Sequence, residues 1–355
     1  MRVLTVGNRY PPAGVGGYER IWAGTVDALR RAGHEVRVLT SDAPARGGEP
    51  DVFRELRWYW RDGAWVRPRG VARDALAALR RHLAAFQPDV VSWWGMGGLS
   101  LSLLGEPPRA GIPAVGLVAD GWMVYGFDAD PDARAAGVEL GSAARWLFIS
   151  RAVEARARAE GHRLPRTGLA HPGVDPRRFP FSPPEPWGWR LACIGRVEDG
   201  KGVEVAVRAL EHLPREATLT VDGAGDLNVD GPRVRRTCTP TDRIAAAYAA
   251  TDAVLFPVTW LEPWGLVPLE AMSSGRPVVA TATGGSAEYL AHAHNCLVVP
   301  PGDAVALAAA VRRLAGDATL RSRLVEGGRA TAARFTQAGF EATVVEALEA
   351  EAQRP

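Results

Sequence analysis

The stretch FPVTWLEPWGLVPLEAMSSGRPVVATATGGSAE, residues 256–288, contains two carboxylates, Glu262 and Glu270, eight positions apart. It overlaps the apolar run TDAVLFPV at 251–258, which predicts a buried strand. The segment LEAMSSG is rich in helix formers and ends at Gly275, a residue typical of helix C-caps. We therefore expect Glu262 on the loop that leaves the strand, and Glu270 in the first turns of the next helix.

The N-terminus of that helix is a candidate anion site. The amides expected there belong to Gly265, Leu266 and Val267. Free N–H groups and the positive end of the helix dipole suit an anion such as a phosphate. The segment PVVAT at 277–281 predicts the next buried strand, and Gly284-Gly285 opens another turn. Taken alone, the two glutamates fit equally well as solvated carboxylates on a helix face.

The N-terminal segment has the order strand, glycine-rich loop, helix, strand. MRVLTVGN at 1–8 and HEVRVLTSD at 34–42 are the strands, and the helix is expected at about 19–32. This order begins a doubly wound parallel sheet. Gly16 and Gly17 lack side chains, so their backbone can approach a phosphate or sugar closely. An ordinary tight turn between strand and helix is the alternative.

Two further strands, at 88–98 and 111–122, end in aromatic and polar residues. The carboxyl edge of a parallel sheet is where such folds bind ligands. The side chains expected at this edge are Trp93, Trp94, Met96, Asp120 and Trp122. The apolar members suit stacking on a sugar ring or on a hydrophobic ligand. The alternative is that half of them belong to the core.

Length and composition bound the class of protein. A chain of 355 residues is natural for two domains. A hydrophobic content of 47% and a charged content of 23% are ordinary for a globular protein. The net charge of +2 gives no case for nucleic acid, and no apolar run approaches the ~20 residues of a membrane span. Two of the three cysteines, Cys193 and Cys296, lie in apolar strand-like runs and are expected as buried thiols, which fits the cytoplasm.

Lysine usage singles out one position. Of the 42 basic Lys and Arg residues, Lys201 is the only lysine. Such a bias is typical of a GC-rich genome, and chance survival of one lysine is one explanation. The other is a site that needs a compact ammonium, which a planar guanidinium does not replace.

Two segments suggest other functions. FRELRWYWRDGAWVRPRG at 53–70 has the basic and aromatic character of a peripheral membrane or anionic-acceptor surface. We favour a strand with alternating buried aromatics followed by a loop. Asp128 and Asp130 form a D-x-D pair that can hold a hard cation. Because the pair lies on a polar loop, in a chain whose other motifs indicate a different fold, no metal site is expected.

The ordered motifs identify a family resemblance. The glutamate pair, the following EAMSSGRPVVAT and the turn at 284–288 resemble the family 4 retaining glycosyltransferases. The pair Gly195-Arg196 with Lys201-Gly202 also resembles that family, as do Gly16-Gly17 and HPGVD at 171–175. The resemblance implies that Glu262 contacts the donor sugar beside the anomeric carbon and that Glu270 bonds the ribose hydroxyls. It also implies that Arg196 and Lys201 flank the donor pyrophosphate and neutralise the leaving charge.

The resemblance implies an α/β fold with two Rossmann-like, doubly wound domains facing across a cleft, the GT-B fold. The domains are expected at 1–180 on the acceptor side and 190–335 on the nucleotide-sugar side. Trp93, Trp94, Met96 and Trp122 would then face the acceptor, a sugar or a hydrophobic aglycone. A Pro-rich linker is expected at 182–190, and a last segment, 336–355, packs back on the first domain.

The expected reaction is metal-independent, retaining transfer of a sugar from a nucleoside-diphosphate donor to a hydroxyl of a small molecule or glycan, without a cofactor. Many members carry His just before Asp120, where this chain has Ala119, so Asp120 is a candidate substitute. Covalent attack by Glu262 is the less favoured route. A nucleotide-sugar epimerase and a donor-binding pseudoenzyme are the alternative functions.

Overall fold

The computed structural model describes residues 1–13, 16–43, 49–61, 64–65 and 70–354, in two compact units. Unit 1 comprises Met1–His171 and Gly339–Pro355, and unit 2 comprises Pro172–Ala338. The sequence placed the corresponding boundaries at 180, 190 and 336. In the structure the Pro-rich linker therefore belongs to unit 2, and the chain returns to unit 1 inside its last helix.

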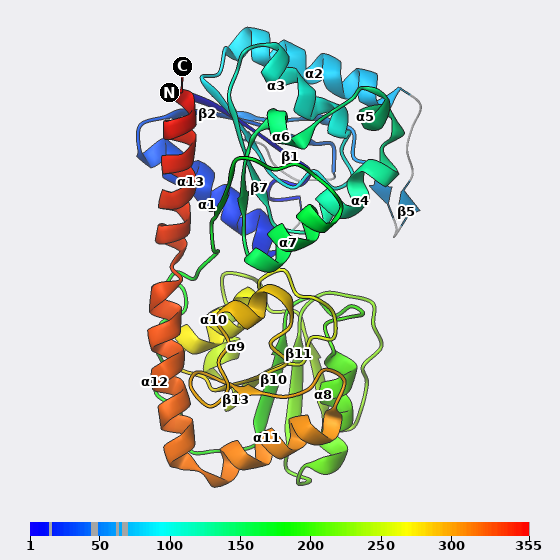
Figure 1. The fold of residues 1–355 in the computed structure, drawn as a ribbon. Coiled ribbons are helices and arrows are strands. Elements are labelled where there is room, and N and C mark those ends of the chain that lie inside the picture. The colour runs from blue at the N-terminus through cyan, green and yellow to red at the C-terminus, as the bar shows by residue number, and fades with distance from the viewer. Residues whose placement is uncertain (14–15, 44–48, 62–63, 66–69, 355) are drawn as a thin grey trace. The chain divides into compact units, whose positions relative to one another are not determined.

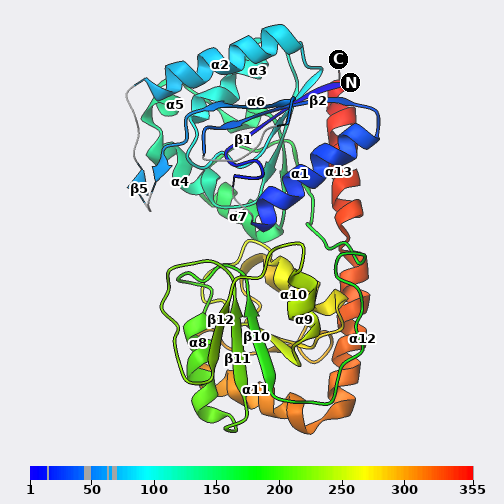
Figure 2. The same ribbon diagram turned by 180° about the vertical axis from the view of Figure 1, so that it is seen from behind.

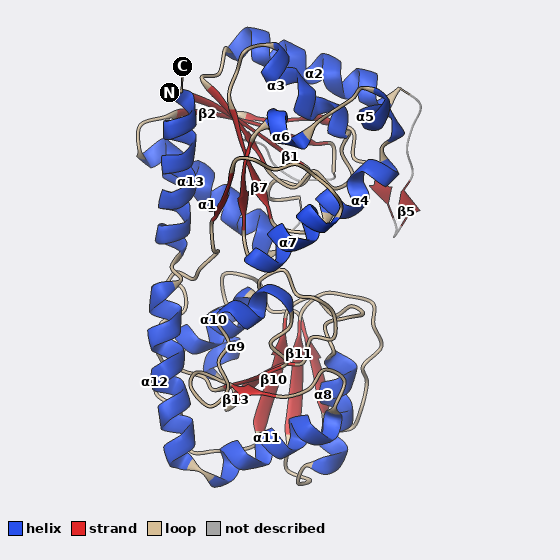
Figure 3. Ribbon diagram, viewed as in Figure 1, coloured by secondary structure: helices blue, strands red, loops and turns tan. Residues whose placement is uncertain are grey.

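Unit 1 is built on a seven-stranded sheet of order β3-β2-β1-β6-β7-β8-β9, in which every neighbouring pair is parallel (Figure 3). The strands are β1 (Arg2–Gly7), β2 (Glu35–Ser41), β3 (Val52–Leu56), β6 (Val90–Trp93), β7 (Ala114–Val118), β8 (Arg145–Phe148) and β9 (Thr167–Leu169), with the hairpin β4 (Trp60–Arg61) and β5 (Ala64–Trp65) outside the sheet. The helices are α1 (Gly17–Arg31), α2 (Val71–Phe86), η1 (Leu101–Gly105), α3 (Glu106–Arg109), α4 (Trp122–Ala129), α5 (Pro131–Ala135), α6 (Leu140–Ala143), α7 (Arg151–Ala159) and α13 (Gln337–Ala352).

The strands of unit 1 are apolar on both faces because helices cover both. Val3, Leu4 and Val6 of β1 are fully buried, although they point alternately to opposite faces. Helices α1 and α2 lie on opposite sides of the sheet (Figures 1 and 2). The last helix, α13, joins the α1 side, where Glu341 pairs with Arg31 at 3.2 Å and Glu349 bonds His34 at 3.0 Å.

Unit 2 repeats the design with a six-stranded parallel sheet of order β12-β11-β10-β13-β14-β15. Its strands are β10 (Arg190–Ile194), β11 (Thr218–Asp222), β12 (Val234–Thr237), β13 (Ala253–Phe256), β14 (Val278–Ala280) and β15 (Leu297–Val298). Its helices are α8 (Val203–Ala209), η2 (Leu210–His212), α9 (Ile244–Ala249), α10 (Leu266–Ser273), η3 (Gly284–Glu288), α11 (Ala304–Gly316) and α12 (Ala318–Arg334). Helices α8 and α11 pack together on one face, and α10 and α12 pack together on the other (Figure 1).

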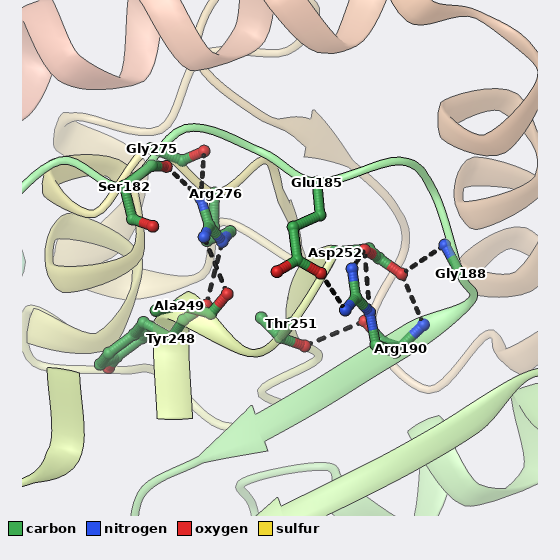
Figure 4. A network of polar contacts seen from close by, with 10 residues as sticks. All are labelled: Ser182, Glu185, Gly188, Arg190, Tyr248, Ala249, Thr251, Asp252, Gly275 and Arg276. Atoms are coloured by element: carbon green, nitrogen blue, oxygen red, sulfur yellow. Dashed lines mark hydrogen bonds and ion pairs between the residues drawn. The ribbon is translucent and has the colours of Figure 1, made fainter. Parts of the chain in front are cut away.

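The linker of unit 2 is fixed by two arginines (Figure 4). Arg276 is 2% exposed and donates to the carbonyls of Ser182 and Tyr248 at 2.7 and 3.0 Å, so a buried cation joins the linker to the end of α9. Arg190 donates to Asp252 at 2.6 Å, and the same carboxylate accepts the Gly188 amide. Both arginine side chains are hydrogen-bonded within unit 2, and these bonds hold the linker against the end of α9 and the start of β10.

The predicted α/β class with two doubly wound parallel sheets is confirmed. One local prediction differs. The segment around Asp128 and Asp130 is not a loop, because α4 ends there and Asp130 caps α5. The strand predicted at the start of the 53–70 stretch is present as β3, where Phe53 packs beside His82 at the edge of the sheet, whereas residues 62–63 and 66–69 lie outside the described residues. Within the described ranges, no helix has the length and apolar character needed to cross a membrane.

Candidate functional site

The order of the second sheet brings two loops together. Strand β10 pairs with β11 on one side and β13 on the other, so the topological switch lies at β10. In such folds ligands bind at this point, outside the carboxyl ends of the strands. The loop after β10 carries Lys201, and the loop after β13 carries Glu262. The Thr259 amide donates to the Gly200 carbonyl at 2.9 Å, which ties the two loops to each other.

The centre of this site is a group of three side chains. Lys201 Nζ donates to Glu262 Oε2 at 2.8 Å. Trp260 Nε1 donates to the same oxygen at 2.7 Å, and the ammonium lies 4.7 Å from the centre of the indole ring. The structure thus unites two predicted residues, Glu262 and Lys201, and adds a third.

The backbone of Glu262 is also fixed. The Gly285 amide donates to the Glu262 carbonyl at 2.7 Å. Gly284 has φ +58°, and a Cβ built there would lie 2.4 Å from that same carbonyl oxygen. Only a glycine permits this approach, so the Gly-Gly turn predicted from the sequence serves to hold Glu262 in place.

The second glutamate lies deeper. Glu270 is the fifth residue of α10 and is 4% exposed. The Tyr248 hydroxyl donates to its Oε2 at 2.6 Å. Helix α10 starts at Leu266, so Pro268 lies in its first turn, where a proline is tolerated. The amides at the start of α10, those of Leu266 and Val267 after the N-cap Gly265, have no acceptor in the preceding turn.

The loop between the glutamates rests on a buried tyrosine. The Tyr289 hydroxyl donates to the Gly265 carbonyl. Burial raises the pKa of Tyr289 well above its ordinary value, and the carboxylates of Glu262 and Glu270 add to the rise. The phenol therefore stays protonated at every physiological pH and remains a donor to this loop.

Arg196 is placed differently from Lys201. Its side chain is 65% exposed, and Nη1 lies 2.9 Å from Glu198 Oε2. Arg196 follows β10 on the same loop as Lys201, so it belongs to the carboxyl edge of the sheet, as predicted from its position. Its partner in the structure is a glutamate of its own loop.

The carboxyl edge of the first sheet carries a second polar cluster. Asn8 follows β1 and donates to the Gly97 carbonyl at 2.9 Å. Asp120 follows β7 and accepts the Trp122 amide at 2.9 Å. Burial raises the pKa of Tyr18, and Asp120 adds to the rise, so this phenol stays neutral. Asp120 thus lies at the predicted edge.

The glycines at 16 and 17 take structural positions at the start of α1. The Gly16 amide donates to Glu19 Oε2 at 2.9 Å, and Gly17 is the first residue of the helix. A Cβ at Gly16 would lie 2.5 Å from that carboxylate oxygen. That oxygen is the end of a flexible side chain that can shift, so this contact does not require a glycine, and the approach of a ligand at Gly16 and Gly17 stays a prediction.

The predicted acceptor-facing surface is wrong for its four apolar side chains. Trp93, Trp94, Met96 and Trp122 are each at most 1% exposed. The Trp94 ring stacks on Trp22 at 5.8 Å, and Trp122 packs edge-on against Trp146 at 5.6 Å. All four belong to the core of unit 1, because burying an aromatic ring contributes more than leaving it in water.

The D-x-D pair does not converge on a common point. Asp130 is fully buried and accepts the Leu101 amide at 2.7 Å and the Ala133 amide at 3.2 Å. Asp128 is exposed and pairs with Arg134 at 2.9 Å. In the described part of the chain, no group of three or more His, Cys, Asp or Glu residues is arranged to hold a metal ion. Asp130 is thus a helix cap and a buried structural acceptor.

A surface hollow of about 840 Å³ lies away from these loops. Its lining includes Arg2 at the start of β1, Asp89 just before β6, and Glu106. It is therefore at the amino edge of the first sheet, opposite the edge that binds ligands in such folds. Two of its arginines, Arg80 and Arg109, both pair with Glu106 at 2.6 Å, so one carboxylate is shared between two guanidinium groups.

Sequence reasoning missed three supporting residues, Trp260, Tyr248 and Tyr289. Trp260 lies two positions before Glu262, and its proximity was the one available signal. Tyr248 comes from α9 and Tyr289 from the end of η3, so only the fold brings them to the glutamates.

Comparison with known proteins gives matches over both units. The family model described as Glycosyltransferase Family 4 matches residues 15–178, and the model described as Glycosyl transferases group 1 matches residues 188–317. A curated relative, glycogen synthase of Mycobacterium tuberculosis, is 30% identical over 93% of this chain and 89% of its own. The GDP-mannose-dependent alpha-mannosyltransferase of Mycolicibacterium smegmatis is 28% identical over 88% of each chain.

Solved structures agree with the fold. Anabaena HepE in complex with UDP-glucose superposes with a TM-score of 0.76 at 19% identity, covering 99% of this chain and 100% of its own. Sucrose-phosphate synthase from Thermosynechococcus elongatus has a TM-score of 0.76 at 20% identity, over 97% of each chain.

Proposed function

The chain belongs to glycosyltransferase family 4 and is a nucleotide-sugar-dependent glycosyltransferase, and we propose that it transfers the sugar with retention of anomeric configuration and without a metal ion. The observation that carries this proposal is the convergence of Lys201 and Glu262 at the switch point of the second sheet. A cation for phosphate and a carboxylate for the sugar lie on adjacent loops there.

The leaving group is a nucleoside diphosphate, so the main electrostatic task is to stabilise negative charge on the departing phosphate. Lys201, Arg196 and the free amides at the start of α10 supply positive charge or N–H donors for it. These groups take the part that a bound cation would otherwise play. Glu270, deeper in α10, is assigned to the ribose hydroxyls.

The proposed step is attack on the same face from which the leaving group departs. The acceptor oxygen bonds to the anomeric carbon as the carbon–oxygen bond to phosphate breaks. The bonding pair goes to the phosphate oxygen, and that oxygen takes the proton of the acceptor hydroxyl. Glu262 stabilises the positive charge that develops on the sugar ring. The residue directly before Asp120 is Ala119 and not a histidine, so we propose no histidine-assisted step.

The acceptor class is proposed from the relatives. Curated relatives are named glycogen synthase and D-inositol 3-phosphate glycosyltransferase, so their names imply hydroxyl acceptors on a glucan and a cyclitol phosphate. HepE was solved with UDP-glucose, and the mannosyltransferase is named for GDP-mannose. We propose a hydroxyl-bearing sugar or polyol as acceptor, and a cytoplasmic location in keeping with the buried free thiols Cys193 and Cys296.

The test is incubation with UDP-glucose, GDP-mannose and ADP-glucose, each with and without glucans, monosaccharides and inositol phosphates. Proton NMR follows the donor and the product anomer. A retained anomer in a new glycoside, unaffected by EDTA, is the expected result. Isomerisation of the donor sugar alone would indicate an epimerase, binding without turnover would indicate a pseudoenzyme, and an inverted anomer would refute retention.

A further inference from the structure

Trp260 is the residue of this site that no motif assigns. It lies in the loop between β13 and α10, half-buried, and its N–H group donates to Glu262 Oε2 at 2.7 Å. We propose that Trp260 is a positioning residue for the transfer reaction, an inference that rests on the proposed function. Its hydrogen bond fixes the Glu262 carboxylate through Oε2, so that Oε1 remains the acceptor for a hydroxyl of the donor sugar.

The two oxygens of Glu262 have different surroundings. Oε2 accepts two hydrogen bonds, from Trp260 and from Lys201. Oε1 accepts none from the residues that the structure describes, and it is not among the buried atoms left without a partner. A carboxylate that is saturated on one oxygen and open on the other has a preferred direction for its next donor. A sugar hydroxyl is a donor of that kind.

Lysine alone does not fix this geometry. The ammonium is a point charge on a flexible stem, with three donors that rotate freely. Trp260 restricts the position of the ammonium in two ways. It donates to the same oxygen, Oε2, and the centre of its indole ring lies 4.7 Å from Nζ. The same ring therefore orients both the cation and the anion of the pair.

Trp260 is itself held by its neighbours. A Cβ built at Gly200 would lie 2.6 Å from a ring carbon of Trp260, so the indole packs directly on the Gly200 backbone. The hydrogen bond from the Thr259 amide to the Gly200 carbonyl, 2.9 Å long, keeps that backbone beside the tryptophan. A rigid aromatic ring on a rigid support is what a positioning residue requires, because small displacements of a catalytic group cost rate.

The test separates the N–H group from the ring. Trp260→Phe keeps an aromatic face under Lys201 but removes the donor to Glu262, and Trp260→Leu removes both. Hydrolysis of the nucleotide sugar in water is the readout, since it needs no identified acceptor. For Trp260→Phe we expect kcat about 10-fold lower, the loss of one hydrogen bond to a charged group. The dissociation constant of the bare nucleoside diphosphate should stay within about twofold. Trp260→Leu should also disturb the diphosphate affinity, because the indole no longer orients Lys201.

A matched control is Trp146→Phe. Trp146 Nε1 also makes a 2.7 Å hydrogen bond, to the Leu140 carbonyl, but inside the core of unit 1. This substitution removes the same chemical group and should leave kcat unchanged while lowering the unfolding temperature. A similar fall in kcat for both variants would assign the Trp260 effect to general destabilisation and overturn the proposal.

Binding measurements complete the test without turnover. Calorimetry with UDP, GDP and ADP, and with UDP-glucose, GDP-mannose and ADP-glucose, gives the change in affinity that the sugar adds. Trp260→Phe should reduce the affinity that the sugar adds when Glu262 is present. It should have no such effect in a Glu262→Ala background, where the carboxylate is absent. Equal effects in both backgrounds, or none in either, refute positioning and leave the transferase function standing. A wild-type protein that binds none of the six ligands refutes the proposed function instead.

Discussion

Lys201 Nζ lies 2.8 Å from Glu262 Oε2, so the only lysine of the chain forms an ion pair with the first of the two glutamates that stand eight positions apart. The two side chains are 18% and 9% exposed, so both charges are largely removed from water. Removal of one partner from such a pair leaves the other charge uncompensated. In the proposed reaction a donor phosphate would compete with Glu262 for the ammonium, which would couple phosphate binding to the carboxylate assigned to the sugar.

Replacement of Lys201 should therefore weaken nucleotide binding. We expect Lys201→Ala to raise the dissociation constant of the nucleoside diphosphate about 10- to 100-fold, the loss of one charge-assisted contact. Lys201→Arg should not restore it, because the planar guanidinium does not reproduce a compact ammonium between Glu262 and the indole. Calorimetric titration measures this, with Arg177→Ala as the control: Arg177 is 90% exposed and pairs with Asp175. Unchanged affinity in Lys201→Ala for every nucleotide that wild type binds contradicts the assignment.

The two glutamates should separate in kinetics. Glu262→Gln removes charge that acts on the developing sugar cation, so kcat should fall about 10²- to 10³-fold while the affinity for the bare diphosphate is kept. Glu270→Gln should mainly raise the KM for the donor, since ribose is bound equally in ground and transition states. Steady-state kinetics with nucleotide titration measures both. Loss of nucleotide binding in Glu262→Gln, with binding intact in Glu270→Gln, would show that the roles are exchanged.

Chelation should leave turnover unchanged if cations and amides of the protein stabilise the leaving group, as proposed. Treatment with excess EDTA followed by assay of donor consumption is the measurement. Turnover that is lost on chelation and restored by Mg²⁺ or Mn²⁺ contradicts this expectation.

The D-x-D carboxylates should matter for stability instead. Asp130→Ala removes a helix cap and a buried acceptor, a loss of about 1–2 kcal/mol, and should lower the midpoint of thermal unfolding. Asp128→Ala is the matched control, because its carboxylate is exposed and contributes a surface pair with Arg134. Equal midpoints for the two variants would contradict the structural role of Asp130.

The fold was predictable because buried parallel strands are apolar on both faces. The run at 251–258 contains β13, and 277–281 contains β14, with each end displaced by one or two residues. The meeting of the Lys201 and Glu262 loops also follows from topology, since β10 and β13 are neighbours at the switch point. The sequence thus placed both residues on loops that follow strands, and the family resemblance placed them at one donor, whereas the strand order that joins the two loops comes from the structure.

The burial of the tryptophans was not predictable in the same way. Trp93 and Trp94 are adjacent, and a strand directs adjacent side chains to opposite faces. The sequence does not show that helices cover both faces at that end, so a stacking surface and a core were equally compatible with it. Tyr248 is a further case: it precedes Glu270 by 22 positions, and only the packing of α9 beside α10 places its hydroxyl at the carboxylate.

The three cysteines should differ in reactivity. Burial raises the pKa of the Cys193 thiol to about 12, with the Glu204 carboxylate adding to the rise, and burial likewise raises that of Cys296 to about 12. Because the thiolate is the nucleophile, both thiols stay protonated and unreactive at pH 8. Cys238, just after β12, is exposed. Native protein should therefore take up one equivalent of iodoacetamide by mass spectrometry, and denatured protein three. Cys238→Ser should abolish native labelling, whereas labelling of Cys193 at pH 8 would show that its strand opens to solvent.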